Sequence, residues 1–172
     1  MGEVVAGVTG WQVRRAVVED ALSIARINVA AWRSAYAGIV PDEYLSAMTT
    51  EQRTQRWQQI LSTPGPYATF LALDADDALA GYCSLGAQDS AELMSIYVDP
   101  ARYRTGAGRA VHDAAIAWLR ESDFEQAGLW VFAANERARA FYAAQGWAPN
   151  GITRDDEIMG AVIAELRYTR PL

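Results

Sequence analysis

Hydrophobic residues in the first third of the chain recur at helical spacing. From residue 19 to about residue 36, an acidic pair is followed by apolar positions about 3.6 residues apart, which predicts a helix with acidic side chains in its first turn. A second helical region is expected over residues 41–60. The cluster Ser62-Thr63-Pro64-Gly65-Pro66 should end it, because proline and glycine interrupt regular structure.

Alternating or continuous apolar runs, which are typical of strands, dominate much of the remaining chain. Two more helices are expected, one after the turn at residues 106–108 and one from Asn135 to about Gln145. This order, a meander followed by strand–helix–strand–helix–strand, predicts an α/β fold with a mixed sheet and helices on its faces. The run Glu92–Val98 is apolar enough to predict burial on both faces. The expected strands are Gln12–Val18, Tyr67–Leu73, Ala78–Leu85, Glu92–Val98, Gly128–Phe132 and Gly160–Tyr168, with a weaker one beginning at Ile152.

The segment from Tyr97 to Val111 leads from a strand through a basic loop into the first turn of a helix. Gly106 and Gly108 leave the backbone N–H groups of that turn without Cβ atoms around them. Since the first N–H groups of a helix have no internal acceptor and the helix dipole is positive there, the turn can bind a phosphate or pyrophosphate. A loop whose glycines only permit a tight turn explains the same two residues equally well.

Two nucleotide-binding motifs do not fit this loop. A dinucleotide fingerprint needs a third glycine at the position of Val111. A P-loop needs a lysine and a hydroxyl residue, where this chain has Arg109 and Ala110. A nucleotide-binding protein is therefore the least favoured interpretation of the loop.

Composition predicts one domain over residues 1–172, with residues 1–10 as a flexible N-terminus. The formal net charge of −6 argues against nucleic acid as a partner, because such binding depends on neutralising phosphates. No apolar run reaches the roughly 20 residues that span a membrane, and no basic leader begins the chain. With a single cysteine, Cys83, the protein is expected to be cytoplasmic.

Four segments resemble, in order and spacing, the GNAT superfamily of acyl-CoA N-acyltransferases. Residues 103–108 are similar to its signature, which is Arg or Gln, any two residues, Gly, any residue, and Gly or Ala. Residues 96–100 look like its fourth strand and following loop, residues 134–147 like its second motif, and residues 29–45 like the start of many bacterial members. The chain departs from the signature at Tyr103, and we expect Arg104 to supply the missing positive charge.

The resemblance implies a mostly antiparallel sheet of six to seven strands that splays between the fourth and fifth strands, with helices on both faces. It also implies acetyl-CoA as the acyl donor. Separately from the resemblance, a metal site is not expected, because His112 has no second His or Cys near it in the sequence. The pantetheine arm would pair with the backbone of Ile96, Tyr97 and Val98, and an N–H group of Tyr97 or Ile96 would face the thioester oxygen. Asn135 would contact the arm, or would cap a helix, or both. The pyrophosphate would lie on the amides of Arg104, Thr105, Gly106, Ala107, Gly108 and Arg109.

Catalytic roles also follow from the resemblance. Tyr142 matches a tyrosine that protonates the leaving thiolate, although it could instead be an aromatic packing residue. Glu92 is the best candidate for the base, with a solvated strand-end charge as the alternative, and Asp89 or a water relay stay open. Trp32 and Tyr36, one helical turn apart, would form walls of the acceptor pocket or pack in the core.

These observations predict an N-acetyltransferase that moves an acetyl group from acetyl-CoA to a primary amine by direct transfer. The acidic charge favours a small-molecule amine over a protein N-terminus or lysine. A non-catalytic CoA-binding regulatory module is the alternative from another class. A homodimer is also expected, because members of the family often pair through edge strands or helices.

Overall fold

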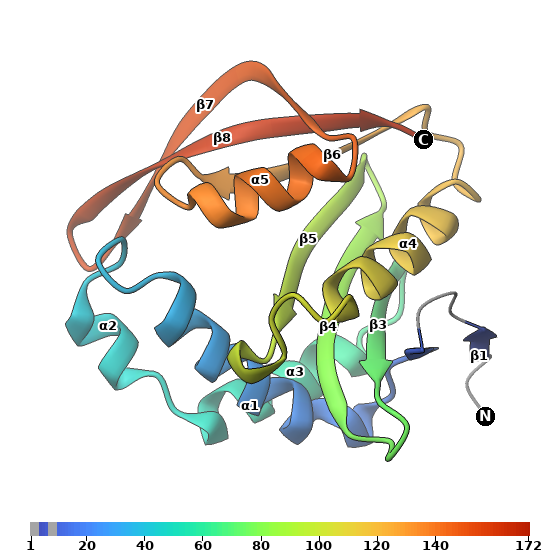
Figure 1. Ribbon diagram of the computed structural model, residues 1–172. Coiled ribbons are helices and arrows are strands. Elements are labelled where there is room, and N and C mark those ends of the chain that lie inside the picture. The colour runs from blue at the N-terminus through green and yellow to red at the C-terminus, as the bar shows by residue number, and fades with distance from the viewer. Residues whose placement is uncertain (1–3, 7–9) are drawn as a thin grey trace.

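One sheet flanked by helices makes up the described part of the chain, residues 4–6 and 10–172, in this computed structural model (Figure 1). The strands are β1 (Val4–Ala6), β2 (Gln12–Arg15), β3 (Tyr67–Leu73), β4 (Leu79–Ala87), β5 (Ala91–Val98), β6 (Gln126–Phe132), β7 (Ala148–Ile158) and β8 (Ala161–Pro171). The helices are α1 (Ala21–Ala35), α2 (Asp42–Ala47), α3 (Thr50–Ser62), α4 (Ala107–Leu119) and α5 (Glu136–Ala144). Short 3-10 turns lie at Val18–Asp20 and Pro100–Arg102.

The strands lie in the order β1-β2-β3-β4-β5-β6-β8-β7. Neighbouring strands are antiparallel except β5 and β6, whose parallel pairing holds only at Ala91↔Ala127 and Glu92↔Gly128. Beyond these pairs the two strands separate, as Figure 1 shows. The expected mixed sheet with a splay is therefore confirmed. The splay falls at β5 and β6 because β1 precedes the first strand expected, which gives the described residues an eight-stranded sheet.

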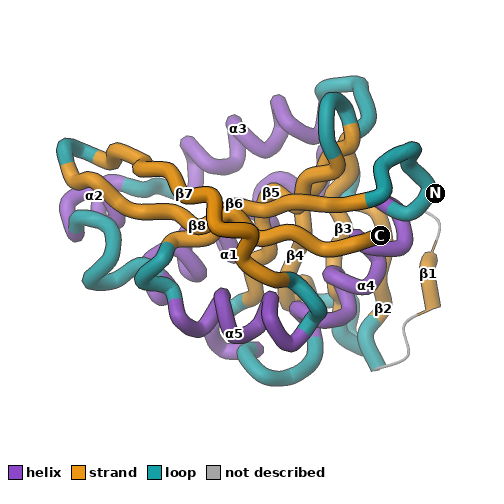
Figure 2. The backbone as a smooth tube through the Cα atoms, turned by 90° about the horizontal axis from the view of Figure 1, so that it is seen from above, coloured by secondary structure: helices purple, strands orange, loops and turns teal. Residues whose placement is uncertain are grey.

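Helices cover both faces of the sheet (Figures 1 and 2). On one face, Ile24 of α1 and Trp57 of α3 are buried against Tyr82 of β4. On the other face, Val111 and Leu119 of α4 are buried with apolar residues of the central strands, and α5 contributes to the same cluster. Since both helical layers meet the sheet at the splay, a ligand that enters between β5 and β6 can reach residues of either layer.

The strands differ from expectation where local pattern is a weak guide. The first expected strand ends at Arg15 instead of Val18, because residues 18–20 form a 3-10 turn whose Asp20 accepts hydrogen bonds from Arg14 and from the Val17 amide. The prediction that Glu92–Val98 is buried on both faces is wrong, since the Met94 side chain is 57% exposed beside the splay.

The weak strand expected from Ile152 begins at residue 148, as β7. It runs along the sheet edge with nearly all of its residues exposed, so no hydrophobic alternation marks it. Of the N-terminal residues expected to be flexible, 1–3 and 7–9 lie outside the described residues, while Val4–Ala6 form β1. None of the helices in the described ranges has the length and apolar character needed to cross a membrane.

Candidate active site

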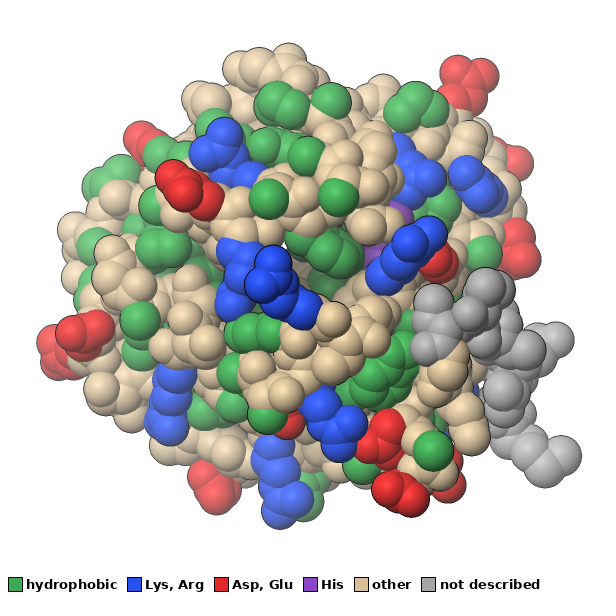
Figure 3. Space-filling model, in the orientation of Figure 1, with side chains coloured by type: hydrophobic (Ala, Val, Ile, Leu, Met, Phe, Trp, Pro, Cys, Tyr) green, Lys and Arg blue, Asp and Glu red, His purple; other side chains and the backbone are tan. Residues whose placement is uncertain are grey.

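The splay opens a cavity of about 550 Å³. Its walls come from α1, β5, the loop before α4 with the first turn of that helix, β6, α5 and the β7–β8 hairpin. In the face that Figure 3 shows, basic side chains stand beside a recess with hydrophobic side chains inside it. A channel with a basic entrance and an apolar interior suits a ligand that has an anionic part and an uncharged part.

The loop before α4 has an unusual backbone, with two residues in the left-handed region. Gly106 is the N-cap of α4 with φ +95°, and Arg104 also has a positive φ of +63°. No side chain caps the helix, so the N–H groups of its first turn have no intrahelical acceptor. The loop is held in place because the Trp11 indole donates to the carbonyl of Thr105 at 3.0 Å. This geometry provides a ready site for an anion.

Five of the six loop residues expected at a pyrophosphate do line the cavity, namely Arg104, Gly106, Ala107, Gly108 and Arg109. Thr105 is not among the lining residues, and its hydroxyl donates to the carbonyl of Arg102 at 2.7 Å. The Thr105 side chain therefore stabilises the conformation of the loop instead of lining the cavity.

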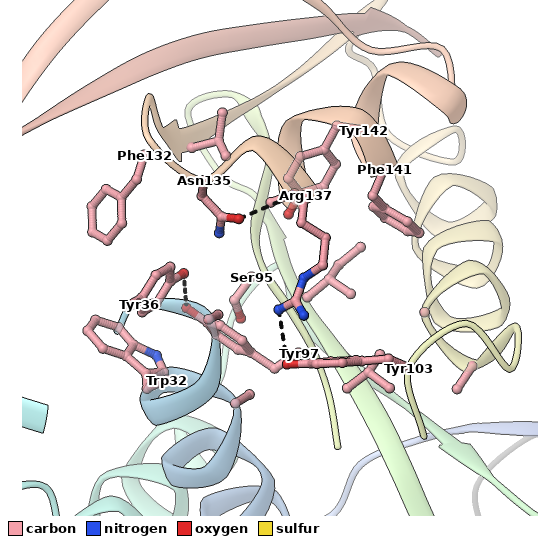
Figure 4. A pocket seen from close by; sticks show the side chains of 18 of the residues that line it. Trp32, Tyr36, Ser95, Tyr97, Tyr103, Phe132, Asn135, Arg137, Phe141 and Tyr142 are labelled. Atoms are coloured by element: carbon pink, nitrogen blue, oxygen red, sulfur yellow. Dashed lines mark hydrogen bonds between the residues drawn. The ribbon is translucent and has the colours of Figure 1, made fainter. Parts of the chain in front are cut away.

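The charge missing at Tyr103 has a source that sequence reasoning overlooked. The guanidinium of Arg137, at the start of α5, lies 4.0 Å from the centre of the Tyr103 ring and donates to its hydroxyl at 3.1 Å. Figure 4 shows Arg137 reaching across the cavity to Tyr103. Both residues line the cavity, as does the exposed Arg104. The only signal in the sequence was the departure at Tyr103, because the two residues are 34 positions apart.

The expected binding strand lies along the cavity. Ile96, Tyr97 and Val98 of β5 line it, and this part of β5 has no pairing with β6. The Tyr97 hydroxyl is 2.9 Å from that of Tyr36, and burial raises the pKa of Tyr97 well above its ordinary value. The free edge of β5 thus offers backbone groups to a ligand in the splay.

Two residues of the α5 region face the cavity from the opposite side (Figure 4). Asn135 is the N-cap of α5, and its side-chain oxygen accepts from the Ala138 amide at 3.1 Å. Tyr142 is 8% exposed and packs edge-on against Phe141 and Trp147. No described residue forms a hydrogen bond with the Tyr142 hydroxyl, and burial raises the pKa of this phenol well above 10.

The far end of the cavity is aromatic. Trp32 and Tyr36 of α1 line it, their ring centroids 4.8 Å apart, and Tyr36 lies 5.0 Å from Phe132 of β6. The two α1 residues are only half-buried, so they serve as a wall of the cavity. Asp156 of β7 and Glu165 of β8 also line this end, and sequence reasoning missed both because no motif marks the hairpin.

Glu92 does not fit the expected role of base. It is absent from the cavity lining, and Arg167 of β8 binds both of its carboxylate oxygens in a bidentate ion pair. The alternative carboxylate, Asp89, does not line the cavity either. Because Arg167 occupies both of its oxygens and the side chain does not line the cavity, Glu92 joins β5 to β8 instead.

Three known proteins are similar to the chain over most of its length. It is 31% identical over 161 residues to Uncharacterized N-acetyltransferase YuaI of Bacillus subtilis (strain 168), covering 90% of this chain and 89% of that protein. It is 23% identical over 152 residues to Spermidine N(1)-acetyltransferase of Thermoplasma acidophilum, covering 86% and 94% of the two chains. The crystal structure of PaiA N-acetyltransferase from Thermoplasma acidophilum in complex with coenzyme A shares the fold, with a TM-score of 0.70, 20% identity, and coverage of 94% and 99%.

The fold and the cavity are those of an enzyme that transfers acetyl groups, for which acetyl-CoA is the co-substrate. The model of the Acetyltransferase (GNAT) family matches residues 29–147, and the chain belongs to this family. The expected family, fold class and enzyme class are therefore confirmed.

Proposed function

We propose that this N-acetyltransferase moves an acetyl group from acetyl-CoA directly to a primary amine of a small molecule, with Tyr142 as the general acid. The observation that carries the proposal is the Tyr142 hydroxyl, since Tyr142 lines the cavity and its hydroxyl forms no hydrogen bond with a described residue. The side chain is 8% exposed, but its hydroxyl oxygen is not a fully enclosed atom, so it is open to the cavity and can donate a hydrogen bond to a ligand there.

The residues around the cavity fit coenzyme A in shape and charge. The pyrophosphate would lie on the N–H groups of Gly106, Ala107 and Gly108, where the helix dipole is positive. Arg104, Arg109 and Arg137 surround this end of the cavity. The pantetheine arm would follow the free edge of β5, with the Asn135 amide group facing it from α5.

The transfer itself asks little of the chain beyond orientation and one proton. The amine nitrogen forms a bond to the thioester carbonyl carbon, the C–S bond breaks, and the nitrogen loses a proton to solvent. An N–H group of Ile96 or Tyr97 would stabilise the negative charge on the carbonyl oxygen. Tyr142 donates its proton to the departing thiolate, which leaves as the free thiol, and the phenolate then takes a proton back from solvent. The raised pKa of Tyr142 suits this role because the phenol is protonated at neutral pH.

The aromatic lining of the acceptor end and one relative support a small amine over a protein. Trp32, Tyr36 and Phe132 wall this end, and a relative, Spermidine N(1)-acetyltransferase, is named for a small amine. A cytoplasmic location and a homodimer stay predictions; the buried free thiol of Cys83 needs no oxidising compartment.

The test is thiol release from acetyl-CoA with a panel of small amines, peptides with free N-termini, and peptides with lysine. Mass spectrometry identifies the acetylated product. The chain itself contains no lysine, so acetylation of its own side-chain amines cannot contribute to the signal. Turnover of small amines supports the proposal, and turnover of peptides alone would identify a protein acetyltransferase. Binding of coenzyme A with no turnover on any amine would indicate a regulatory module.

A further inference from the structure

The cavity has two ends of opposite charge. Arg104, Arg109 and Arg137 line the end near α4, where an anion is expected. Asp156 and Glu165 also line the cavity, and Glu165 lies opposite Phe132 of the aromatic wall. Two guanidinium groups are near this wall without lining the cavity: that of Arg154 pairs with Glu165, and that of Arg53 lies 5.3 Å from the centre of the Trp32 ring. An electrostatic gradient along the cavity would orient a ligand whose two parts differ in charge.

Glu165 is built into the acceptor end with one oxygen committed and one available. Its side chain is 9% exposed, and Oε2 accepts from Nε of Arg154. Arg154 is itself held by stacking on Trp130, with the guanidinium 4.2 Å from the ring centre. No described residue donates to Oε1 of Glu165. Oε1 is not fully enclosed, so a largely buried carboxylate presents one oxygen to the cavity, where a cationic or hydrogen-bonding ligand group can bind it.

The sheet register explains how the acidic residues come together. Glu165 lies directly opposite Phe132 on β6 and opposite Arg154 on β7. Asp156 lies two residues beyond Arg154, so its side chain is on the same face of the hairpin. The two carboxylates are therefore diagonal neighbours beside the aromatic wall.

The aromatic rings add a second attraction for cations. Trp32, Tyr36 and Phe132 present π faces or edges to the same end of the cavity. Burial raises the pKa of Tyr36, so its phenol is neutral and the negative charge there belongs to the carboxylates. With Arg154 paired to Glu165, Asp156 leaves the chamber one negative charge in excess. Carboxylates beside aromatic rings are a favourable site for an alkylammonium group.

We propose that this acidic and aromatic chamber selects acceptors that carry a second positive charge, such as aliphatic diamines, and that Glu165 binds the distal ammonium group. The inference rests on the proposed function, since it assigns a substrate class to the same cavity. One amine of the acceptor reacts at the splay, and the other is held by Glu165 and Asp156.

Two amines that differ only in the distal charge test this: 1-aminobutane and 1,4-diaminobutane. Their binding to the full chain saturated with coenzyme A is measured by calorimetry, which does not depend on turnover. The diamine is expected to bind at least about tenfold more tightly. Glu165→Gln should remove most of this preference and Asp156→Asn part of it, while the affinity for coenzyme A stays within about twofold. Asp156→Asn also serves if Glu165→Gln does not fold, because Asp156 is exposed.

Glu157→Gln is the matched control, because Glu157 is an exposed carboxylate of the same strand that does not line the cavity. It should retain the full preference for the diamine. Equal binding of the two amines to the wild-type chain would overturn the proposal, as would a preference that survives both cavity substitutions or is lost equally in Glu157→Gln. Diamine binding without acetyl transfer would instead refute the proposed function and leave the chamber in place.

Discussion

Replacing Tyr142 by phenylalanine removes one oxygen atom and leaves the packing unchanged. The ring keeps its contacts with Phe141 and Trp147, at centroid distances of 5.5 and 6.3 Å. Because no described residue bonds to the Tyr142 hydroxyl, no buried partner loses its hydrogen bond. The free energy of unfolding should therefore change by less than about 0.5 kcal/mol.

The expected loss is in catalysis. General acid catalysis contributes roughly 10² to 10⁴ in rate, so kcat for Tyr142→Phe should fall at least about a hundredfold, or ~2.7 kcal/mol in activation free energy. The affinity for coenzyme A should stay within about twofold, since the hydroxyl acts on the leaving thiolate. Because burial raises the pKa of Tyr142, this group should cause no fall in wild-type kcat up to pH 10, and the acid is lost only above its folded pKa.

The assay combines steady-state thiol release, calorimetry with coenzyme A, and thermal unfolding. Tyr168→Phe is the control, because the Tyr168 hydroxyl accepts a hydrogen bond from Arg139 at 3.3 Å and does not line the cavity. It should lower the melting temperature and leave kcat unchanged. A Tyr142→Phe variant with wild-type kcat would refute the general-acid role. Parallel losses of stability and coenzyme A affinity would show that Tyr142 is a packing residue.

Three further changes test the loop, the bridging arginine and the buried histidine. Gly106→Ala should lower the free energy of unfolding by about 1–2 kcal/mol, because φ is +95°, and should weaken coenzyme A binding in calorimetry. The control is Gly38→Ala, with φ +76° and no part in the cavity, which should show only the loss of stability. Equal coenzyme A affinities in the two variants would contradict a role of Gly106 in binding. Arg137→Gln should weaken coenzyme A binding about fivefold at low salt and less at high salt. Arg139→Gln, on the same helix but outside this cavity, should leave the affinity for coenzyme A unchanged. Equal losses of affinity in the two variants would refute a specific role of Arg137. Burial lowers the pKa of His112, so as pH falls below about 6.5 the unfolded chain takes up a proton before the folded chain does. The free energy of unfolding, measured in urea, should therefore decline from about pH 6.5 down to the folded pKa of His112. The same decline in His112→Gln would show that another group causes it.

The local hydrophobic pattern predicted the bounds of those elements whose residues are buried to the same degree along their whole length. The strand Tyr67–Leu73 has the bounds expected from its apolar run, because all but its first residue are buried. The start of α4 was likewise readable, since Gly106 and Gly108 meet a backbone requirement within a few residues. The edge strand β7 was not, because its exposed residues have no apolar alternation and it is ordered mainly by contacts with distant segments, namely its pairing with β8 and the stacking of Arg154 on Trp130.

The roles of charged residues were harder to infer than the elements. Glu92 was the expected base because the family can place a carboxylate near the start of this strand, but Arg167, 75 residues later, binds it. Arg137 and Tyr103 bridge the cavity from two elements, and neither position suggests the other. An ion pair or a stack depends on where two distant segments meet, which residue spacing does not encode.

The order of elements, the glycine turn at Gly106 and the family follow from the amino-acid sequence, because each depends on residues that are near one another in the chain. The tertiary structure decided which side chains share the cavity and which charges are already neutralised. Strand pairing brings Glu165 beside Phe132 and Arg154. The packing of α5 leaves the Tyr142 hydroxyl in the cavity wall without a hydrogen bond to any described residue. Chemistry at the site depends on these long-range contacts, since burial and nearby charge set what each group can do.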